Sequence, residues 1–270
     1  MSSFKSIEIF TITYFFGAGF MLFIVLIGLL IVIGPINMPT DNDSIQTNTY
    51  EIDGEAFDVE IRLGDVEGYP DVIRSSSFML FSRSYVTPND PTVEKVYERL
   101  EAGMSGMGKL DKANYILGFI QDNIEYVSDS ESHYSNDYVQ YPAETLLLKM
   151  GDCEDMAILL HTLYSKAGLD SVILYCEDHF TVGVNVPLDE GYYVTLPFYG
   201  IRYYIAEATG TIEVGGSYAD DVKFVFKPEI SYFGLFCMIV GFSGLAFVVR
   251  INRVDDEEYH FFTVSKAVVQ

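Results

Sequence analysis

The chain has 270 residues and a formal net charge of −23, set by 39 acidic and 16 basic side chains. Between Met38 and Glu229 there are 34 acidic residues against 12 Lys and Arg, which gives this segment a charge near −22. Such an excess repels nucleic acid and anionic lipid, excludes both as partners of this segment, and otherwise indicates a well-solvated surface. Three cysteines, one of them inside an apolar run, are too few for a disulfide scaffold.

Two apolar runs near the ends of the chain predict membrane spans. The first is uncharged from Ile9 to Thr40 and contains FFGAGFMLFIVLIGLLIVIG, so we expect a span at 9–36. A cleaved signal peptide would have a shorter apolar region and a small-residue cleavage site, and this run has neither. The second run, SYFGLFCMIVGFSGLAFVV, predicts a span at 230–249. A helical hairpin buried in the domain is the alternative for both runs.

The basic residues predict the orientation of these spans. Lys5 precedes the first span, and Arg250 and Arg253 directly follow the second. By the positive-inside rule both termini, 1–8 and 250–270, are cytoplasmic. The expected location is the cell membrane, with the intervening domain outside the cytoplasm.

The segment between the spans begins with a polar linker. Residues 37–49, NMPTDNDSIQTNT, are rich in turn-forming residues and predict a stalk. An extracytoplasmic domain at 50–229 follows. Alternating apolar residues in AFDVEIRL and SFMLFSRSYV predict short strands at its start.

Two amphipathic helices are predicted next. The run PTVEKVYERLEA begins with Pro91 and Thr92, and KLDKANYILGFIQDNIEYV carries apolar residues at helical spacing. The polar and aromatic stretch 128–142 then predicts a surface loop.

A single cysteine stands at the start of the next predicted helix, in KMGDCEDMAILLHTLYSKAG, 149–168. Unpaired N–H groups and the dipole at a helix start stabilise a thiolate, the nucleophilic form of Cys153. Helical spacing puts Asp152 at the cap and turns Glu154 and Asp155 about 100° and about 200° away from the thiol. These acids should therefore support the helix more than they oppose the thiolate. Without a nearby base, the cysteine would be a buried structural residue.

Strand-like runs follow that helix, and one of them supplies a base. SVILYC, HFTVGVNV and RYYIAEAT predict an antiparallel sheet facing the helix. His161 lies about 12 Å further along the cysteine's own helix, and His133 and His260 lie in a loop and the tail. His179 remains, and strand alternation lets Glu207 lie beside it and orient its imidazole. An exposed edge-strand carboxylate is the alternative for Glu207.

Three segments in this order resemble the transglutaminase-like superfamily, particularly its membrane-attached archaeal members: VQYPAETLLLKMGDCEDMAILLHTLYSKAG, HFTVGV and YYIAEATG. The resemblance covers about 88–215 and implies an α+β, papain-like core, with the cysteine helix packed on an antiparallel sheet. With the two predicted spans, this core would be flanked by transmembrane helices. The resemblance implies Cys153 as nucleophile, His179 as general base and Glu207 as orienting acid, where aspartate is more usual.

The implied reaction is acyl transfer through a thioester. Gln140 is a candidate oxyanion donor beside the backbone N–H of Cys153, with an ordinary loop glutamine as the alternative. Water would complete hydrolysis of a peptide or carboxamide, and an amine would complete a transamidation. We expect a protein or peptide substrate and no cofactor or metal.

Three other roles remain open. Cys153, Cys176 and His179 are possible zinc ligands, although their spacing matches no finger or ribbon. Cys153 and Cys176 are also possible disulfide partners in an oxidising exterior. Finally, the domain could be a non-catalytic binding or scaffold module on the outer membrane face.

Overall fold

The computed structural model describes part of the chain, and the described residues are 20–26, 37–70, 74–75, 85–132, 137–176, 179–195, 200–217, 222–227 and 239–240. The chain forms two units, 1–30 with 233–270, and 31–232, and the candidate site lies in the second. The predicted spans fall mostly outside the described residues. Within those residues, no helix has both the length and the apolarity needed to cross a bilayer.

The second unit begins with an antiparallel hairpin. Strands β1 (Ile45–Ile52) and β2 (Glu55–Arg62) pair along their full length. The two-residue turn between them uses Asp53 and Gly54, at φ of 51° and 78°. Positive φ at both positions gives the twist that a tight hairpin requires.

The polar linker lies against the short helix that follows the hairpin. Residues 37–44 run beside α2 (Leu63–Glu67), and the Met38 N–H donates to the Gly68 carbonyl at 3.0 Å. The end of the predicted stalk is part of β1 instead. The second run predicted as a strand, within 77–86, falls mostly outside the described residues.

Helices α4 (Pro91–Gly103) and α5 (Lys109–Asn123) confirm the two predicted amphipathic helices. Asp90 caps α4, since its side chain accepts two backbone N–H groups of the first turn. At the end of α5, the Asn123 side chain donates to the Glu51 carbonyl at 2.6 Å and so attaches the hairpin to the helix.

Short elements lead from α5 to the cysteine helix. They are β3 (Glu125–Tyr126), α6 (Asp129–Ser132), α7 (Pro142–Leu148) and β4 (Met150–Gly151). Strands β3 and β4 pair in parallel, so the end of α5 is tied to the chain just before Cys153.

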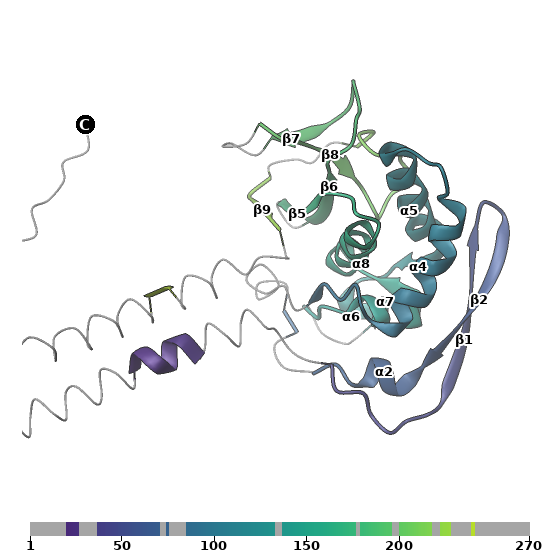
Figure 1. Ribbon diagram of the computed structural model, residues 1–270, viewed down its shortest axis with the longest axis vertical. Helices are drawn as coiled ribbons and strands as arrows, with labels where there is room; N and C mark the ends of the chain where they lie inside the picture. The colour runs from purple at the N-terminus through teal and green to yellow at the C-terminus, as the bar shows by residue number, and fades with distance from the viewer. Residues whose placement is uncertain are drawn as a thin grey trace, which may run out of the picture. The chain divides into compact units, whose positions relative to one another are not determined.

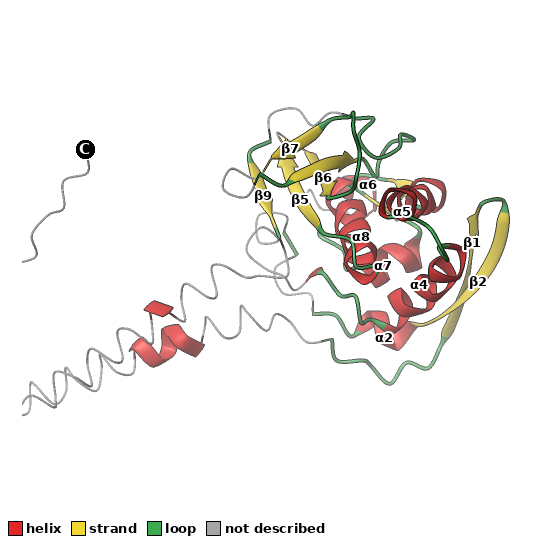
Figure 2. Cartoon of the chain, turned by 45° about the horizontal axis from the view of Figure 1, so that its top comes forward, coloured by secondary structure: helices red, strands yellow, loops and turns green. Residues whose placement is uncertain are grey.

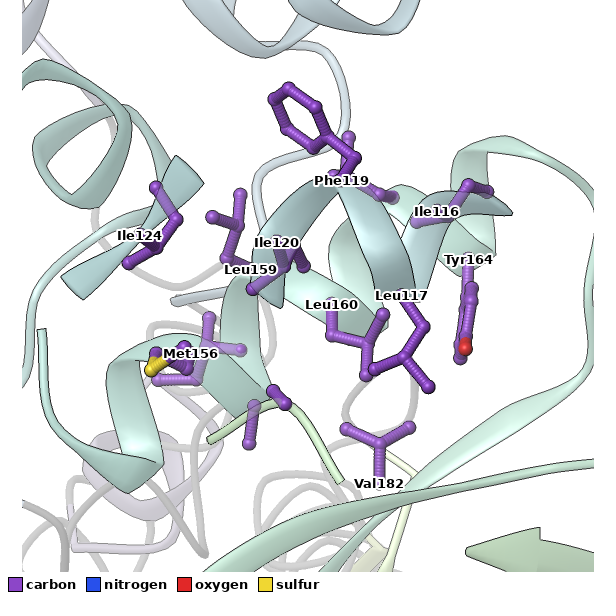
Figure 3. Close-up of a cluster of buried hydrophobic side chains, with 14 of the residues drawn as sticks. Ile116, Leu117, Phe119, Ile120, Ile124, Met156, Leu159, Leu160, Tyr164 and Val182 are labelled. Atoms are coloured by element: carbon purple, nitrogen blue, oxygen red, sulfur yellow. The ribbon is translucent and has the colours of Figure 1, made fainter. Parts of the chain in front are cut away.

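Helix α8 (Cys153–Lys166) is the centre of the core and is buried on every side rather than on one face. Each residue from Glu154 to Tyr164 is buried. The helix lies between α5 and the sheet described next, which explains why its pattern is apolar all round. The contacting side chains in Figure 3 are Ile116, Leu117, Phe119, Ile120, Ile124, Met156, Leu159, Leu160, Tyr164 and Val182.

A five-stranded antiparallel sheet completes the domain in the order β7-β8-β6-β5-β9. Ile173, Val182 and Ala206 belong to the core cluster that the sheet shares with α8. The arrangement of helices beside one antiparallel sheet confirms the predicted α+β class (Figures 1 and 2). The strands are β5 (Ser171–Cys176), β6 (His179–Val184), β7 (Tyr193–Thr195), β8 (Arg202–Ala206) and β9 (Phe224–Phe226).

Candidate active site

The turn before Cys153 is built for close packing. A Cβ added to Gly151, the last residue of β4, would lie 2.7 Å from the Cβ of Asp155. Asp152 is the N-cap of α8, and the Asp155 carboxylate accepts its N–H at 3.3 Å. The GDCED motif therefore combines a glycine that packing requires, acids that cap the helix, and a cysteine at the first helical position.

His179 and Glu207 lie side by side on neighbouring strands. His179 is the first residue of β6, and Glu207 directly follows β8, which pairs with β6. Nε2 of His179 is 2.9 Å from Oε2 of Glu207. The other carboxylate oxygen accepts the backbone N–H and the hydroxyl of Thr209 at 3.1 and 2.6 Å. Strand alternation predicts the first contact, but nothing in the sequence pattern indicates Thr209.

The surroundings of this pair favour both charged forms. The hydrogen bond to Glu207 is the largest influence on the pKa of His179 and raises it, with a further contribution from the charge of Glu154. Burial alone would raise the pKa of Glu207, but the hydrogen bonds from His179 and Thr209 outweigh burial and lower it. Since Nε2 is engaged with the carboxylate, Nδ1 is the ring nitrogen left to accept a proton.

The Cys153 sulfur has contacts on two sides. The backbone N–H of Phe180, the residue after His179, donates to the sulfur. The thiol itself donates to Oε2 of Glu154 at 3.1 Å. Among the hydrogen bonds of the described residues, none joins the sulfur to the His179 ring. The expectation that Glu154 turns away is wrong, because in the first helical turn no preceding turn prevents its side chain from folding back.

The pKa of Cys153 is raised well above its ordinary value. Burial is the largest cause, and the charge and hydrogen bond of Glu154 follow, while the Phe180 N–H lowers the pKa by less. The helix start therefore does not produce the thiolate that its position alone predicts. In this arrangement Cys153 is a neutral thiol at pH 7.

Several carboxyl groups gather around the thiol. Oxygens of Asp129, Asp152 and Asp155 lie within 4.8 Å of one another, as do those of Asp129, Asp137 and Glu154, and the same holds for Asp152, the Cys153 sulfur and Glu154. Burial, followed by the charge of Glu154, raises the pKa of Asp152 to about 8. Both Asp155 oxygens accept backbone N–H groups. Helix capping and raised pKa values account for Asp152 and Asp155, and we assign no metal to the cluster.

Gln140 is buried beside the start of α8, so the predicted surface loop is wrong at this position. The residue is 1% exposed, and its backbone N–H donates to Asp155 at 2.7 Å. Neither polar atom of the side chain has a hydrogen-bond partner among the described residues. A buried amide in this state can bind an incoming polar group without first breaking a protein hydrogen bond.

An ion pair between the buried Arg74 and the partly buried Glu144 holds the segment that carries Gln140. The Arg74 guanidinium donates to both oxygens of Glu144, at 2.6 and 2.9 Å, and to the Val139 carbonyl at 3.1 Å. It also lies over the ring of Tyr141, 4.5 Å from the centroid. This network explains the burial of the segment, and the sequence pattern gives no signal for it because Arg74 is far away along the chain.

Tyr126 on β3 is a further neighbour of the nucleophile. The residue is 54% exposed, although its pKa is raised by partial burial and by the charges of Cys153 and Asp152. An exposed aromatic ring at this position is available for contact with a bound substrate.

Of the other three histidines, the structure describes His161, and its contacts lie elsewhere. His161 is buried, with Nδ1 2.8 Å from the Ser171 hydroxyl, and burial lowers its pKa to about 3. His133 and His260 lie outside the described residues.

The zinc and disulfide alternatives for the cysteines can be compared with the geometry. Cys176 faces His179 across the β5–β6 turn, and both Cys153 and Cys176 are free of disulfides. Within the described part of the chain, the sets of three ligand atoms closer than 4.8 Å include neither Cys176 nor His179.

Comparisons with known proteins bear on the same region. The family described as a transglutaminase-like domain matches residues 92–214, a stretch from α4 to the loop after β8. No curated protein matches the chain. A proposed cysteine protease from Cytophaga hutchinsonii is 15% identical, with a TM-score of 0.33, and the match covers 64% of this chain and 66% of that one. A proposed protease from Parabacteroides distasonis is 15% identical, with a TM-score of 0.31, and the match covers 65% of this chain and 41% of that one. Residues 92–214 are therefore similar to a transglutaminase-like domain.

Proposed function

We propose that the domain is a transglutaminase-like thiol enzyme that transfers or hydrolyses acyl groups at peptide or carboxamide bonds, with Cys153, His179 and Glu207 as a catalytic triad. One observation carries the proposal: the imidazole of His179 is paired with a carboxylate at 2.9 Å, and the next residue, Phe180, donates its N–H to the cysteine sulfur. Covalent acyl transfer requires a base that a third group orients and that can reach the nucleophile, and the His179–Glu207 pair supplies the oriented base one residue from the backbone group that contacts the sulfur.

In the proposed reaction, the Cys153 proton passes to Nδ1 of His179 as the sulfur attacks the carbonyl carbon. Glu207 stabilises the resulting imidazolium and fixes the ring through Nε2. The tetrahedral intermediate then collapses, the carbon–nitrogen bond breaks, and the imidazolium gives its proton to the departing amine. A thioester remains on Cys153, and water or a second amine releases the acyl group.

Gln140 and the backbone N–H of Cys153 are the proposed donors to the negative oxygen of that intermediate. The Gln140 amide is buried and without a partner, and its backbone is bonded to Asp155 in the same helical turn as the nucleophile. A donor that makes no ground-state hydrogen bond serves this purpose well, because no existing bond must break when charge develops.

We further propose that spans at 9–36 and 230–249 anchor the enzyme in the cell membrane, with the domain outside and both termini cytoplasmic. The support is the length of the two uncharged runs and the placement of Lys5, Arg250 and Arg253. The substrate would then be an extracytoplasmic protein or peptide.

A non-catalytic binding domain is the second candidate. The observation that favours it is the thiol bond to Glu154 in place of a bond to His179. Such a domain would keep the fold and lose the chemistry.

Acyl-enzyme formation separates the two candidates. The full chain in detergent is mixed with an N-acylglycine p-nitrophenyl ester, and the reaction is quenched with acid. Mass spectrometry then measures the mass of the peptide that contains Cys153. We expect one equivalent of p-nitrophenol in a burst and an acyl adduct on Cys153, with the rate about 100-fold lower in His179→Ala. Cys176→Ser is the matched thiol control and should retain the burst. An adduct that forms equally fast without His179, or no adduct at all, would favour the binding domain.

A further inference from the structure

The proposed mechanism gives no role to Glu154, yet its side chain accepts a hydrogen bond from the nucleophile. Its carboxylate oxygen lies 3.1 Å from the Cys153 sulfur, and its side chain is buried, with the residue 6% exposed. A buried carboxylate is normally balanced by a cation or by several strong donors. Among the ion pairs of the described residues, none includes Glu154.

The donors that Glu154 does have are weak or shared. One is the Cys153 thiol, and another is the side chain of Asp152, which retains a proton near neutral pH. A thiol is a poor hydrogen-bond donor. Its bond to Glu154 therefore satisfies the carboxylate only as long as the sulfur keeps its proton and its present rotamer.

Other groups around the sulfur do not offset this contact. The groups near the thiol or near Glu154 are all acids or phenols: Asp155 on α8, the N-cap Asp152, Asp129 on α6, Asp137 in the loop before α7 and Tyr126 on β3. From β6 the sulfur receives the Phe180 N–H, and the charge of Glu154 also acts on His179. Glu154 is thus the group that acts on both the nucleophile and its proposed base.

We propose that Glu154 is a positioning residue that latches Cys153: its carboxylate holds the thiol by a hydrogen bond and so keeps it from bonding to His179. The proposal rests on the proposed function, because a latch matters only if the thiol is a nucleophile. Release requires rotation of the Cys153 side chain about its Cα–Cβ bond to another staggered rotamer. The sulfur then loses the Glu154 oxygen and can pass its proton to Nδ1 of His179.

The test measures the alkylation rate of Cys153 by iodoacetamide in the full chain, with peptide mass mapping to separate it from Cys176. Glu154→Gln keeps the shape of the side chain and removes the charge, and it should raise the rate at pH 7 about tenfold or more, because each unit of pKa changes the thiolate fraction tenfold. Glu154→Asp keeps the charge and should stay within about threefold of the wild type. Glu131→Gln, an exposed acid on α6, should leave the rate unchanged.

Two outcomes overturn the latch. One is a Glu154→Gln chain, folded by circular dichroism, that is alkylated no faster than the wild type. The other needs no variant: the pH profile of wild-type alkylation must have its midpoint above the ordinary thiol range, and a midpoint at or below about 8.5 contradicts the latch.

Adding His179→Ala distinguishes failure of the latch from failure of the proposed function. If Glu154→Gln speeds alkylation and the further loss of His179 reverses the gain, both hold. If the gain persists without His179, the latch holds and the triad does not. If Glu154→Gln has no effect while His179→Ala slows the wild type, the triad holds and the latch does not.

Discussion

At the sheet end of the candidate site, His179 and Glu207 share a 2.9 Å hydrogen bond that favours both charged forms, whereas at the helix end Cys153 is held as a neutral thiol among carboxyl groups. The two ends of the site differ in how they are arranged for the proton transfer from Cys153 to His179. The base is oriented in advance, and the nucleophile is restrained. The difference shows that a cysteine at a helix start is not activated by that position alone, since burial and one adjacent carboxylate can outweigh the helix dipole.

Removing the acid at the sheet end should have the largest effect. Glu207→Gln keeps the size of the side chain but no longer favours the imidazolium or the required tautomer. We expect acyl-enzyme formation to fall about 10³-fold, measured by the p-nitrophenol burst. Thr209→Val, which removes only a hydroxyl bonded to Glu207, should have a much smaller effect. Equal loss in both variants would contradict a specific role for the carboxylate.

The ion pair behind the helix end should contribute to stability more than to chemistry. Arg74→Met leaves the partly buried Glu144 without its cation, and we expect the free energy of unfolding to fall by about 3 kcal/mol. Urea denaturation followed by circular dichroism measures the change. Arg99→Met, at an exposed position on α4, is the control and should stay within about 0.5 kcal/mol of the wild type.

The proposed oxyanion donor, Gln140, should stabilise the transition state of acyl transfer. Gln140→Ala should lower the rate of acyl-enzyme formation about 30-fold. Because the amide has no partner in the described structure, its removal should change the free energy of unfolding by less than about 1 kcal/mol apart from lost packing. If Gln140→Ala unfolds the chain enough to explain the whole loss of rate, Gln140 supports the fold and is not an oxyanion donor.

The carboxyl groups around Cys153 should lower the free energy of unfolding at alkaline pH. The pKa of Asp152 is raised to about 8, so the folded chain binds this proton more tightly than the unfolded chain does. Stability is therefore lost as the pH rises from about 4 through about 8. After allowance for its partial exposure, Asp152→Asn should gain on the order of 2 kcal/mol at pH 9 and nothing at pH 4, as measured by urea denaturation. Asp111→Asn, in the first turn of α5, is the control.

The smallest predicted effect is the stability that the His179–Glu207 pair contributes within a limited pH range. The raised pKa of His179 contributes stability that is present below about pH 6.5 and is lost as the pH rises through the folded-state value. The lowered pKa of Glu207 contributes stability that is present above about pH 4.5 and is lost as the pH falls through its folded-state value. Wild type should therefore exceed Glu207→Gln most between about pH 4.5 and 6.5. The excess should be about 0.5 kcal/mol after solvent screening, because the His179 side chain is 36% exposed. An excess that instead grows above pH 8 would contradict the pairing.

Elements with strong local patterns could be predicted from the sequence. Helices α4, α5 and α8 and strands β5, β6 and β8 lie where periodicity and turn residues indicate. The contact between His179 and Glu207 follows from the same reasoning, because strand alternation fixes which side chains share a face. Their catalytic roles stay predictions.

What could not be predicted depends on side-chain conformation and on contacts between distant segments. Spacing places the Cα of Glu154 away from the thiol, but its flexible side chain returns to the sulfur. The burial of Gln140 depends on Arg74, 66 positions earlier in the chain, and no local pattern encodes that contact. Charge and hydropathy predict the two spans, and they stay predictions.

Gly151 has a consequence for how this chain can drift over evolutionary time. A methyl group at this position would meet the Cβ of Asp155, which the helix holds in place, so even alanine would push the nucleophile's turn outward. In an inactive relative, Cys153 could be replaced without harm to the fold. Gly151 could not be replaced as long as the turn before the helix is kept. Distant descendants without a thiol should therefore still be traceable by this small residue.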